Sequence, residues 1–412
     1  MYTILRLQCL VIVLCLCSCS FNNKKERQNI DPSLNNVVEI DLDNSNVSEN
    51  IKYSSFLSMP RTIILDNNEE ALIERIYELD IYNDNIYILD DKLKRFLVFD
   101  VNGKYKYRIG KTGMGPGEYL ELSDFSIDRE QGFVYLLDEG RKRVLEYNLN
   151  TLEFIKDISV GELTGQNYSI QYFNGKLYIN QTAIEENRDN FLLGVYDVKT
   201  GKCENKILDS QEYNNGWKLP LRTGHSNFYS KNSTSPLFVD LFGDKIISFK
   251  DSNYFTSYLI KSDNFICPDD IKEVINTYYK TGLIDLFPLY KSDKIYKISN
   301  LVDMNKYLFF KYRQGMENYN LLYDKSTNKV TTSKLMLNDL ISSTKPLRNL
   351  PFLFSNENGV VSLLRIEDLP YFIEEIIDKG DLNPKIDKYN ELMNIDYDSN
   401  PIIFYYEYKT DK

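Results

Sequence analysis

Short alternating runs of hydrophobic and polar residues dominate the first half of the chain. The stretch "LDIYNDNIYILD" is followed by "RFLVFDVNGKYKYRIG", and turn residues separate the runs at Asn83-Asp84-Asn85 and Asn102-Gly103. A period of two is typical of half-buried β-strands, and these turn residues favour hairpins. The pattern therefore predicts four short antiparallel strands per unit. No helix stands between them to make a parallel crossover.

One such unit recurs directly after itself, because residues 78–100 align without a gap with residues 126–148. The matched positions carry identical or similar residues: Asp80 and Asp128, Tyr87 and Tyr135, Leu89-Asp90 and Leu137-Asp138, Lys94-Arg95 and Lys142-Arg143, and Phe99 and Tyr147. Agreement of this extent indicates an internal repeat of one supersecondary unit.

An aromatic residue followed by Asp or Asn ends the third predicted strand of several units: Phe99-Asp100, Tyr147-Asn148, Tyr196-Asp197 and Tyr323-Asp324. The spacing leaves room for a unit around 241–260 and for a last unit with strands in 356–369 and 400–409. We therefore predict an all-β fold, a six-bladed β-propeller of four-stranded antiparallel blades. Either 36–43 or 61–66 could supply an N-terminal strand that completes the last blade, and the sequence does not distinguish them.

Two segments follow a helical period instead. The first, 268–280, begins with a proline and two acids and carries one apolar stripe, and the second, 367–395, carries two apolar stripes. The stripes are Ile271, Val274, Ile275, Tyr278 and Tyr279; Leu369, Phe372, Ile373, Ile376 and Ile377; and Ile386, Tyr389, Leu392 and Met393. We expect both short helical insertions to pack on the propeller, with a partner-binding face as the alternative.

The N-terminal segment predicts export. A weakly basic start at Arg6 precedes an apolar core at 9–17 that is too short to span a bilayer and fits a signal peptide. Leu16-Cys17-Ser18-Cys19 resembles the bacterial lipobox. This motif predicts a lipoprotein signal peptide at 1–18, lipid attachment (palmitate) at Cys19, a flexible tether at 19–35 and the propeller at 36–412. An ordinary cysteine-rich signal peptide is the alternative.

Two acyl chains would provide stable anchoring. Because Ser20 is not an acidic retention signal, we expect the outer membrane, on either its periplasmic or its surface side. After cleavage, Cys203 and Cys267 would be the only other thiols, and their separation in sequence does not show whether they pair.

Composition supports a folded β protein, with 42% hydrophobic residues, 32 Tyr and 22 Phe. The formal net charge of -11 argues against nucleic acid, which is bound mainly through Lys and Arg. Such a charge also opposes self-association, so we expect a monomer.

The chain resembles the bacterial six-bladed β-propeller lipoproteins, an NHL-like group of largely undefined function. Apart from the lipobox, the resemblance is carried by four stretches: "NIYILDDKLKRFLVFDVNGKYKYRIG", "GMGPGEYLELSDFSID", "VYLLDEGRKRVLEYN" and "DSNPIIFYYEYK". It implies the fold and a membrane-tethered location. It supplies no reaction and no catalytic residues.

The glycine-rich stretch "RIGKTGMGPGEYLELSDFSID" does not match a phosphate-binding loop, because Tyr105 replaces the first glycine that such a loop requires. We interpret it as a bend between two blades. The single histidine, His225, cannot build a multi-histidine metal site, and we expect it to be an ordinary loop or pocket residue. Axial carboxylates that bind Ca²⁺, as in lactonase-type propellers, remain an alternative because the chain is rich in Asp, Glu and Asn.

Propeller geometry predicts one candidate face. The link between blades at 111–119 would share a face with Lys92, Lys94 and Arg95 and with Arg141, Lys142 and Arg143, and Glu118 and Tyr119 would lie near the central opening. We expect this face to bind an anionic or sugar-like ligand or a protein partner. The alternative is that these basic residues pair with Asp90, Asp91, Asp138 and Glu139.

Taken together, these patterns predict a membrane-anchored, non-enzymatic propeller that binds or scaffolds a protein, peptide or glycan partner at the cell envelope. We predict no nucleic-acid partner, no catalytic residue, no metal site and no cofactor, except that Ca²⁺ is possible. The alternative is a Ca²⁺-dependent hydrolase or lactonase with axial carboxylates.

Overall fold

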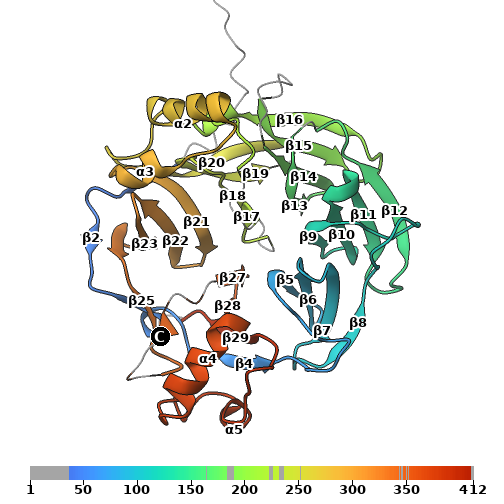
Figure 1. Cartoon of the computed structure of the whole chain (residues 1–412), viewed down its shortest axis with the longest axis vertical. Coiled ribbons are helices and arrows are strands. Elements are labelled where there is room, and N and C mark those ends of the chain that lie inside the picture. Colours follow the sequence, from blue (N-terminus) through green and yellow to red (C-terminus); the bar gives the residue numbers. More distant parts are fainter. Residues whose placement is uncertain are drawn as a thin grey trace, which may run out of the picture. The chain divides into compact units, whose positions relative to one another are not determined.

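The structure is a computed structural model that describes residues 37–163, 165–182, 190–221, 226–231, 236–250, 252–342, 344, 347–348, 350 and 352–409. The predicted signal peptide, Cys19 and the tether lie outside the described residues. Val37–Lys412 form one compact unit. Within it, small sheets stand around a common axis as a six-bladed β-propeller, which confirms the predicted fold (Figure 1).

Blades 1 to 3 are regular, and each consists of four antiparallel strands in sequence order from the axis outward. Blade 1 contains β5 (Ile76–Tyr82), β6 (Asn85–Asp90), β7 (Arg95–Asp100) and β8 (Tyr105–Arg108). Blade 2 contains β9 (Leu122–Asp128), β10 (Phe133–Asp138), β11 (Arg143–Asn148) and β12 (Phe154–Ser159). Blade 3 contains β13 (Asn167–Phe173), β14 (Lys176–Gln181), β15 (Phe191–Asp197) and β16 (Cys203–Asp209).

Blades 4 to 6 are less regular, and N-terminal strands contribute to all three. Blade 4 contains β17 (Phe228–Tyr229), β18 (Leu237–Phe238), β19 (Lys245–Lys250), β20 (Asn253–Lys261) and β1 (Val38–Asp41). Blade 5 contains β21 (Ile295–Asp303), β22 (Tyr307–Gln314), β23 (Glu317–Asp324), β24 (Lys329–Ser333) and β2 (Asn46–Val47). Blade 6 contains β27 (Phe352–Ser355), β28 (Gly359–Leu364), β29 (Ile402–Glu407) and β4 (Arg61–Ile64).

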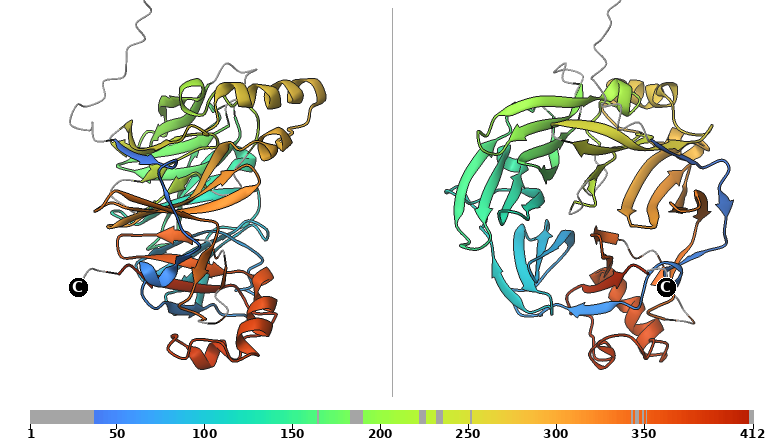
Figure 2. Two further views of the ribbon diagram at one scale, coloured as in Figure 1. Left: turned by 90° about the vertical axis from the view of Figure 1, so that its left-hand side faces the viewer. Right: turned by 180° about the vertical axis from the view of Figure 1, so that it is seen from behind.

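The N-terminal segment runs along the outer edges of these blades (Figure 2). β4 pairs antiparallel with β29, so the candidate 61–66 closes the ring. Blades 4 and 5 keep four antiparallel strands, and β1 and β2 add to them a fifth strand in parallel that the sequence did not predict. Both satisfy backbone groups that an outer edge would otherwise leave unpaired. β3 (Ile51–Lys52) joins β25 (Met336–Asn338) and β26 (Leu347–Arg348) in a small separate sheet.

In blades 1, 2, 3 and 5, the third strand ends in an Asp or Asn that stabilises the turn that follows it. The side chain of Asp100 accepts hydrogen bonds from the backbone N–H groups of Asn102 (2.8 Å) and Lys104 (3.0 Å). Asn148, Asp197 and Asp324 accept equivalent bonds in blades 2, 3 and 5. An Asx side chain can replace backbone contacts in this way, which explains why the aromatic-Asp pattern marks the blades.

Helices occupy the two insertions and a few short connections. They are α1 (Ser210–Tyr213), α2 (Pro268–Thr281), α3 (Phe287–Lys291), α4 (Leu369–Phe372), α5 (Tyr389–Leu392), a π-helix (Ile373–Ile377) and 3₁₀ turns at Tyr53–Ser55, Glu139–Arg141 and Ile366–Asp368. The predicted helix at 268–280 is confirmed. It begins where the Cys267 N–H donates to Asp270 Oδ2 (2.8 Å) and ends at Gly282, which has a φ of 73°.

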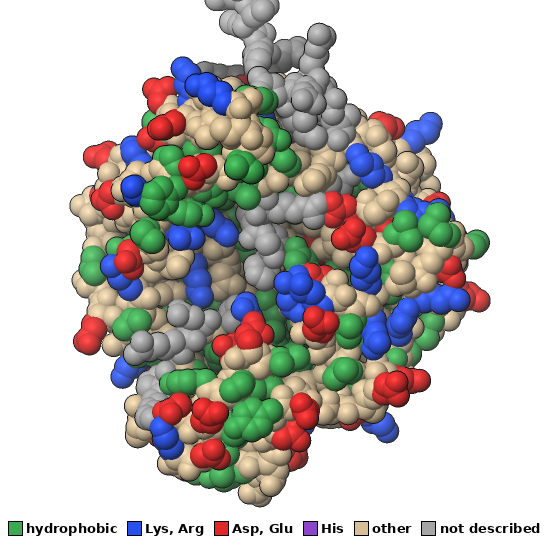
Figure 3. All heavy atoms as spheres, in the orientation of Figure 1, with side chains coloured by type: hydrophobic (Ala, Val, Ile, Leu, Met, Phe, Trp, Pro, Cys, Tyr) green, Lys and Arg blue, Asp and Glu red, His purple; other side chains and the backbone are tan. Residues whose placement is uncertain are grey.

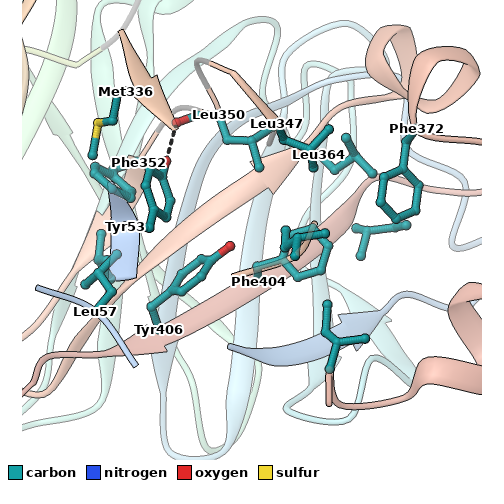
Figure 4. Close-up of a cluster of buried hydrophobic side chains, with 14 of the residues drawn as sticks. Tyr53, Leu57, Met336, Leu347, Leu350, Phe352, Leu364, Phe372, Phe404 and Tyr406 are labelled. Carbon is teal, nitrogen blue, oxygen red and sulfur yellow. Dashed lines mark hydrogen bonds between the residues drawn. The ribbon is translucent and has the colours of Figure 1, made fainter. Parts of the chain in front are cut away.

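The largest core cluster packs blades 5 and 6 against the second insertion. Phe404 of β29, Leu364 of β28 and Phe372 of α4 are all fully buried in it (Figure 4). Tyr53 joins the cluster from the N-terminal segment, and its hydroxyl donates to the backbone oxygen of Leu350 (3.0 Å). The apolar stripe that the sequence showed at 369–377 therefore packs on the propeller, as expected.

Both insertions rise from one face of the ring, as the edge-on view in Figure 2 shows. α2 lies in the link from the outer strand of blade 4 to the inner strand of blade 5, and α4 lies between the second and third strands of blade 6. The loops 111–119 and 139–142 occupy the same kinds of connection in blades 1 and 2. We call this side of the ring the helix face.

Candidate functional site

A cavity of about 250 Å³ lies at the centre of the ring. Residues of the inner strands of blades 1, 2, 4, 5 and 6 line it: β5, β9, β17, β21 and β27. Viewed onto the helix face, the space-filling surface is hollowed near the axis, and Lys and Arg side chains gather there (Figure 3).

The segment 226–231 of blade 4 reaches across the ring. Ser226 donates to Asp124 Oδ2 of blade 2 (2.9 Å), and Lys231 donates to Asp124 Oδ1 (2.6 Å) and to the Phe125 backbone oxygen (3.0 Å). Ser230 Oγ lies 3.3 Å from Ser355 Oγ of blade 6. The segment thus ties three blades together and forms one boundary of the cavity.

The wall formed by blades 1 and 2, which we call the acidic wall, holds Glu78, Asp80 and Asp124. Asp124 is fully buried and pairs with Lys231, and Asp80 pairs with Arg129. Burial raises the pKa of Asp80 in spite of the Arg129 charge. Burial, only partly offset by the Lys231 charge, raises the pKa of Glu78 to about 8. Glu78 is therefore mostly protonated at neutral pH and can donate a hydrogen bond.

The wall formed by blades 5 and 6, which we call the basic wall, holds Lys297, Lys311 and Arg365. Lys297 lies on β21, Lys311 lies on β22 with Ser299 as its register partner, and Arg365 directly follows β28. Burial, together with the nearby Arg365 charge, lowers the pKa of Lys311 to about 8. Burial also lowers the pKa of Lys297. Both shifts indicate cations held in a poorly solvated place.

The charge in the cavity is opposite to that of the whole chain. Of the described residues that line it, four are basic and two are acidic: Lys231, Lys297, Lys311 and Arg365, against Glu78 and Asp80. The whole chain has a formal net charge of -11. A positive cavity in a negative protein is a local feature that solubility does not explain.

Two residues that we expected near the central opening lie elsewhere. Tyr119 is wrongly predicted there, because its ring is fully buried in the core shared by blades 1 and 2. It packs so closely on Gly110 that a Cβ at that position would lie 2.8 Å from Tyr119 Cε1. Glu118 is absent from the cavity lining. It accepts from the Gly115 N–H (2.7 Å) and pairs with Lys111 (3.1 Å), and these contacts, led by the Gly115 bond, lower its pKa.

The predicted basic residues of the helix face divide into buried and exposed groups. Arg143 is only 7% exposed and donates to Asp157 (2.7 Å), Asp138 (3.3 Å) and the Glu118 backbone oxygen (2.5 Å), so it connects the loop 111–119 to blade 2. Its contact with Asp138 is the pairing that we gave as the alternative.

Arg141 donates to the Met114 backbone oxygen (3.3 Å), so loops of two connections do meet on this face. Lys94 and Lys142 are exposed at equivalent left-handed positions, with φ of 52° and 47°, and Arg95 is half-buried. Ligand or partner binding at this face stays a prediction.

The alternative of a calcium enzyme required axial carboxylates. The described residues contain no group of three or more His, Cys, Asp or Glu side chains placed to hold a metal ion. Two carboxylates of the acidic wall, Asp80 and Asp124, are already bonded to Arg129 and Lys231. His225 lies outside the described residues. Cys203 and Cys267 are both free thiols.

Sequence reasoning missed Lys297, Lys311 and Arg365. One signal was present: Lys311 interrupts the aromatic run "YLFFKYRQ", and Lys297 interrupts "IYKISNLVD". A lysine inside an otherwise apolar strand has to be buried or to face the channel, and burial without a partner is costly. Such positions therefore point to the axis of a propeller.

The chain was compared with known proteins. The family described as "Domain of unknown function (DUF4934)" matches residues 36–407. A Bacteroides fragilis protein described as a candidate exported protein is 19% identical, with a TM-score of 0.71 and with 91% of this chain and 100% of that chain covered. A DUF4221 member from Bacteroides vulgatus is 11% identical, with a TM-score of 0.47 and coverages of 86% and 98%. No curated protein matches. The similarity to the Bacteroides fragilis protein shows a shared fold.

Among the described residues, no helix is both long and apolar enough to cross a bilayer.

Proposed function

We propose that this chain, which belongs to the DUF4934 family of unknown function, is a non-enzymatic binding module of the cell envelope that takes its ligand into the cavity at the ring axis. One observation carries the proposal: inner strands of five blades converge on a cavity whose lining is rich in charged side chains and opposite in charge to the protein. Concave sites with a few converging polar groups are the usual places for ligands.

Two of the three carboxyl groups of the acidic wall are committed to structural pairs, which favours a binding role over catalysis. Asp80 and Asp124 each bond a cation that also links two blades. A hydrolase or a Ca²⁺ site would need such groups free to meet water or metal. The cavity volume of about 250 Å³ suits a small ligand or the terminal group of a glycan or peptide.

A ligand screen against a filled cavity tests the proposal. Ser299 lines the cavity, so Ser299→Phe should occupy part of it, while Ser159→Phe places the same side chain on the exposed edge of blade 2. Compounds from a library of small polar metabolites should raise the Tm of the wild type and of Ser159→Phe but not of Ser299→Phe. Failure of every compound to stabilise the wild type, or equal stabilisation of all three proteins, would overturn the proposal.

The envelope location rests on the lipobox at Cys19 and on the likeness of fold to a protein described as a candidate exported protein. Cell fractionation after fatty-acid labelling tests it. The wild type should carry label and sediment with membranes, whereas Cys19→Ala should carry none. Unlabelled wild-type protein would reject the lipid anchor.

A further inference from the structure

Three cations from two blades line the cavity. Lys297 and Lys311 come from neighbouring strands of blade 5, and Arg365 comes from blade 6. The Arg365 charge is among the causes that lower the pKa of Lys311 to about 8, so the two groups act on each other electrostatically. Like charges held together without an anion cost free energy.

Two of these cations, Lys311 and Arg365, meet little counter-charge among the described residues. Lys311 makes no hydrogen bond or ion pair with any described residue. Arg365 forms an ion pair with Glu367 at 3.5 Å, and the Glu367 side chain is 67% exposed and therefore well screened. The charge of the neighbouring Asp368 also acts on Arg365. By contrast, the other lysine of the cavity, Lys231, lies 2.6 Å from a carboxylate. A partly buried cation with no partner among the described residues is expected where a ligand provides the counter-charge.

The remainder of the cavity suits the uncharged part of an organic molecule. Phe125, Tyr77 and Tyr229 line it with aromatic rings, and Ser299 offers a hydroxyl beside Lys311. Glu78 on the facing wall is mostly protonated at neutral pH, so it offers a donor rather than a repelling charge.

We propose that the cavity binds a small organic anion, with a carboxylate or phosphate group held by Lys297, Lys311 and Arg365 and the rest of the molecule against the aromatic side of the cavity. This inference rests on the proposed function and names the ligand class. Charge-assisted hydrogen bonds from several cations supply both affinity and selection against neutral analogues.

Inorganic phosphate is a suitable first probe, because it presents the anionic group without the organic part. Phosphate at constant ionic strength should raise the Tm of the wild type in a saturable manner. In Lys311→Met the half-saturating concentration should rise about tenfold or more, because one charge-assisted bond is lost. Lys311→Arg should keep most of the response, and Lys272→Met, which removes an exposed lysine on α2, should behave as wild type.

Equal phosphate dependence in the wild type and Lys311→Met would overturn the inference, and so would the absence of any response in the wild type. Circular dichroism first shows that each variant is folded, and only then is its phosphate dependence measured. If neutral compounds stabilise the wild type but not Ser299→Phe, while phosphate has no effect, the proposed function stands and the anion assignment fails.

Three matched sugars then distinguish the source of the anionic group: glucose, glucuronate and glucose 6-phosphate. Glucuronate or glucose 6-phosphate should bind at least about tenfold more tightly than glucose, and the better of the two identifies a carboxylate or a phosphate ligand. Equal binding of all three would contradict the assignment.

Discussion

The two walls of the axial cavity hold charged side chains in opposite ways. On the acidic wall, Asp124 is fully buried and bonded by Lys231. On the basic wall, Lys311 has no protein partner among the described residues, and burial lowers its pKa to about 8. One wall therefore uses charge to hold blades together, whereas the other keeps charge available at a cost in stability. Proteins commonly accept such a cost at sites of function.

The largest effect is expected on the acidic wall. Lys231→Met would leave Asp124 buried without its cation, which should lower the free energy of unfolding by about 3–5 kcal/mol. Denaturant unfolding followed by circular dichroism measures this loss. The double variant Lys231→Met/Asp124→Asn should recover part of it, because no buried charge remains unpaired. A loss below about 1 kcal/mol for the single variant would show that Asp124 relies on its backbone donors instead.

On the basic wall, removal of a lysine should raise the free energy of unfolding instead of lowering it. Lys311 has a depressed pKa in the folded state, so its charged form costs stability below a pH of about 8, and this cost disappears as the pH rises toward 10.5. Lys311→Met should therefore stabilise the ligand-free protein at pH 7, by at most about 3 kcal/mol, while it weakens phosphate binding. Thermal unfolding at pH 7 and pH 10 without phosphate measures the change in stability, and the same measurement with phosphate shows the weaker binding. Destabilisation at pH 7 would indicate a structural role for Lys311.

The acidic wall should also make stability depend on pH. Glu78 binds its proton more tightly in the folded state, so its contribution is complete below pH 4.5 and is lost as the pH rises through about 8. The groups that face it are Lys231, Asp80 and Asp124. As the pH rises from 5 to 8.5, the Tm of Glu78→Gln should fall by less than the Tm of the wild type. Parallel Tm profiles for the two proteins would mean that Glu78 is ionised in the folded protein.

The smallest effect is expected outside the cavity. Lys94 and Lys142 are exposed on the helix face. The double variant Lys94→Glu/Lys142→Glu should change stability by no more than about 0.5 kcal/mol and leave the phosphate response intact. Loss of that response would move the anion site from the cavity to the loops. Arg143→Glu would be a poor substitute for this test, because Arg143 bonds two carboxylates and a backbone oxygen.

The fold was predictable from sequence where its determinants are local. The gapless match between 78–100 and 126–148, and the Asx turns at Asp100 and Asn148, are short-range features that a single chain displays. The fifth strands of blades 4 and 5 were not predictable. β1 and β2 pair with residues that follow them by most of the chain, and an edge pairing of two or four residues leaves no pattern in sequence.

The cavity residues were harder to predict from sequence, because they come together only in the folded ring. Lys297 and Lys311 lie on adjacent strands, but Arg365 reaches them only because blade 6 follows blade 5 around the ring. Tyr119 was misplaced because a loop position gives no information on which way a side chain turns, and its apolar ring is better buried. The face of the ring was inferred from connectivity, whereas the cavity lining depends on which residues of each inner strand point inward.

The closing strand β4 also constrains the order of events during folding. Ile64 pairs with Ile402, so the sixth blade cannot be completed until residues near 402 have been synthesised. Blades 1 to 3 contain only consecutive strands and can form earlier, whereas Arg61–Ile64 must wait unpaired. Until then the protein displays an unpaired strand edge, and it is most exposed to aggregation and proteolysis in this interval.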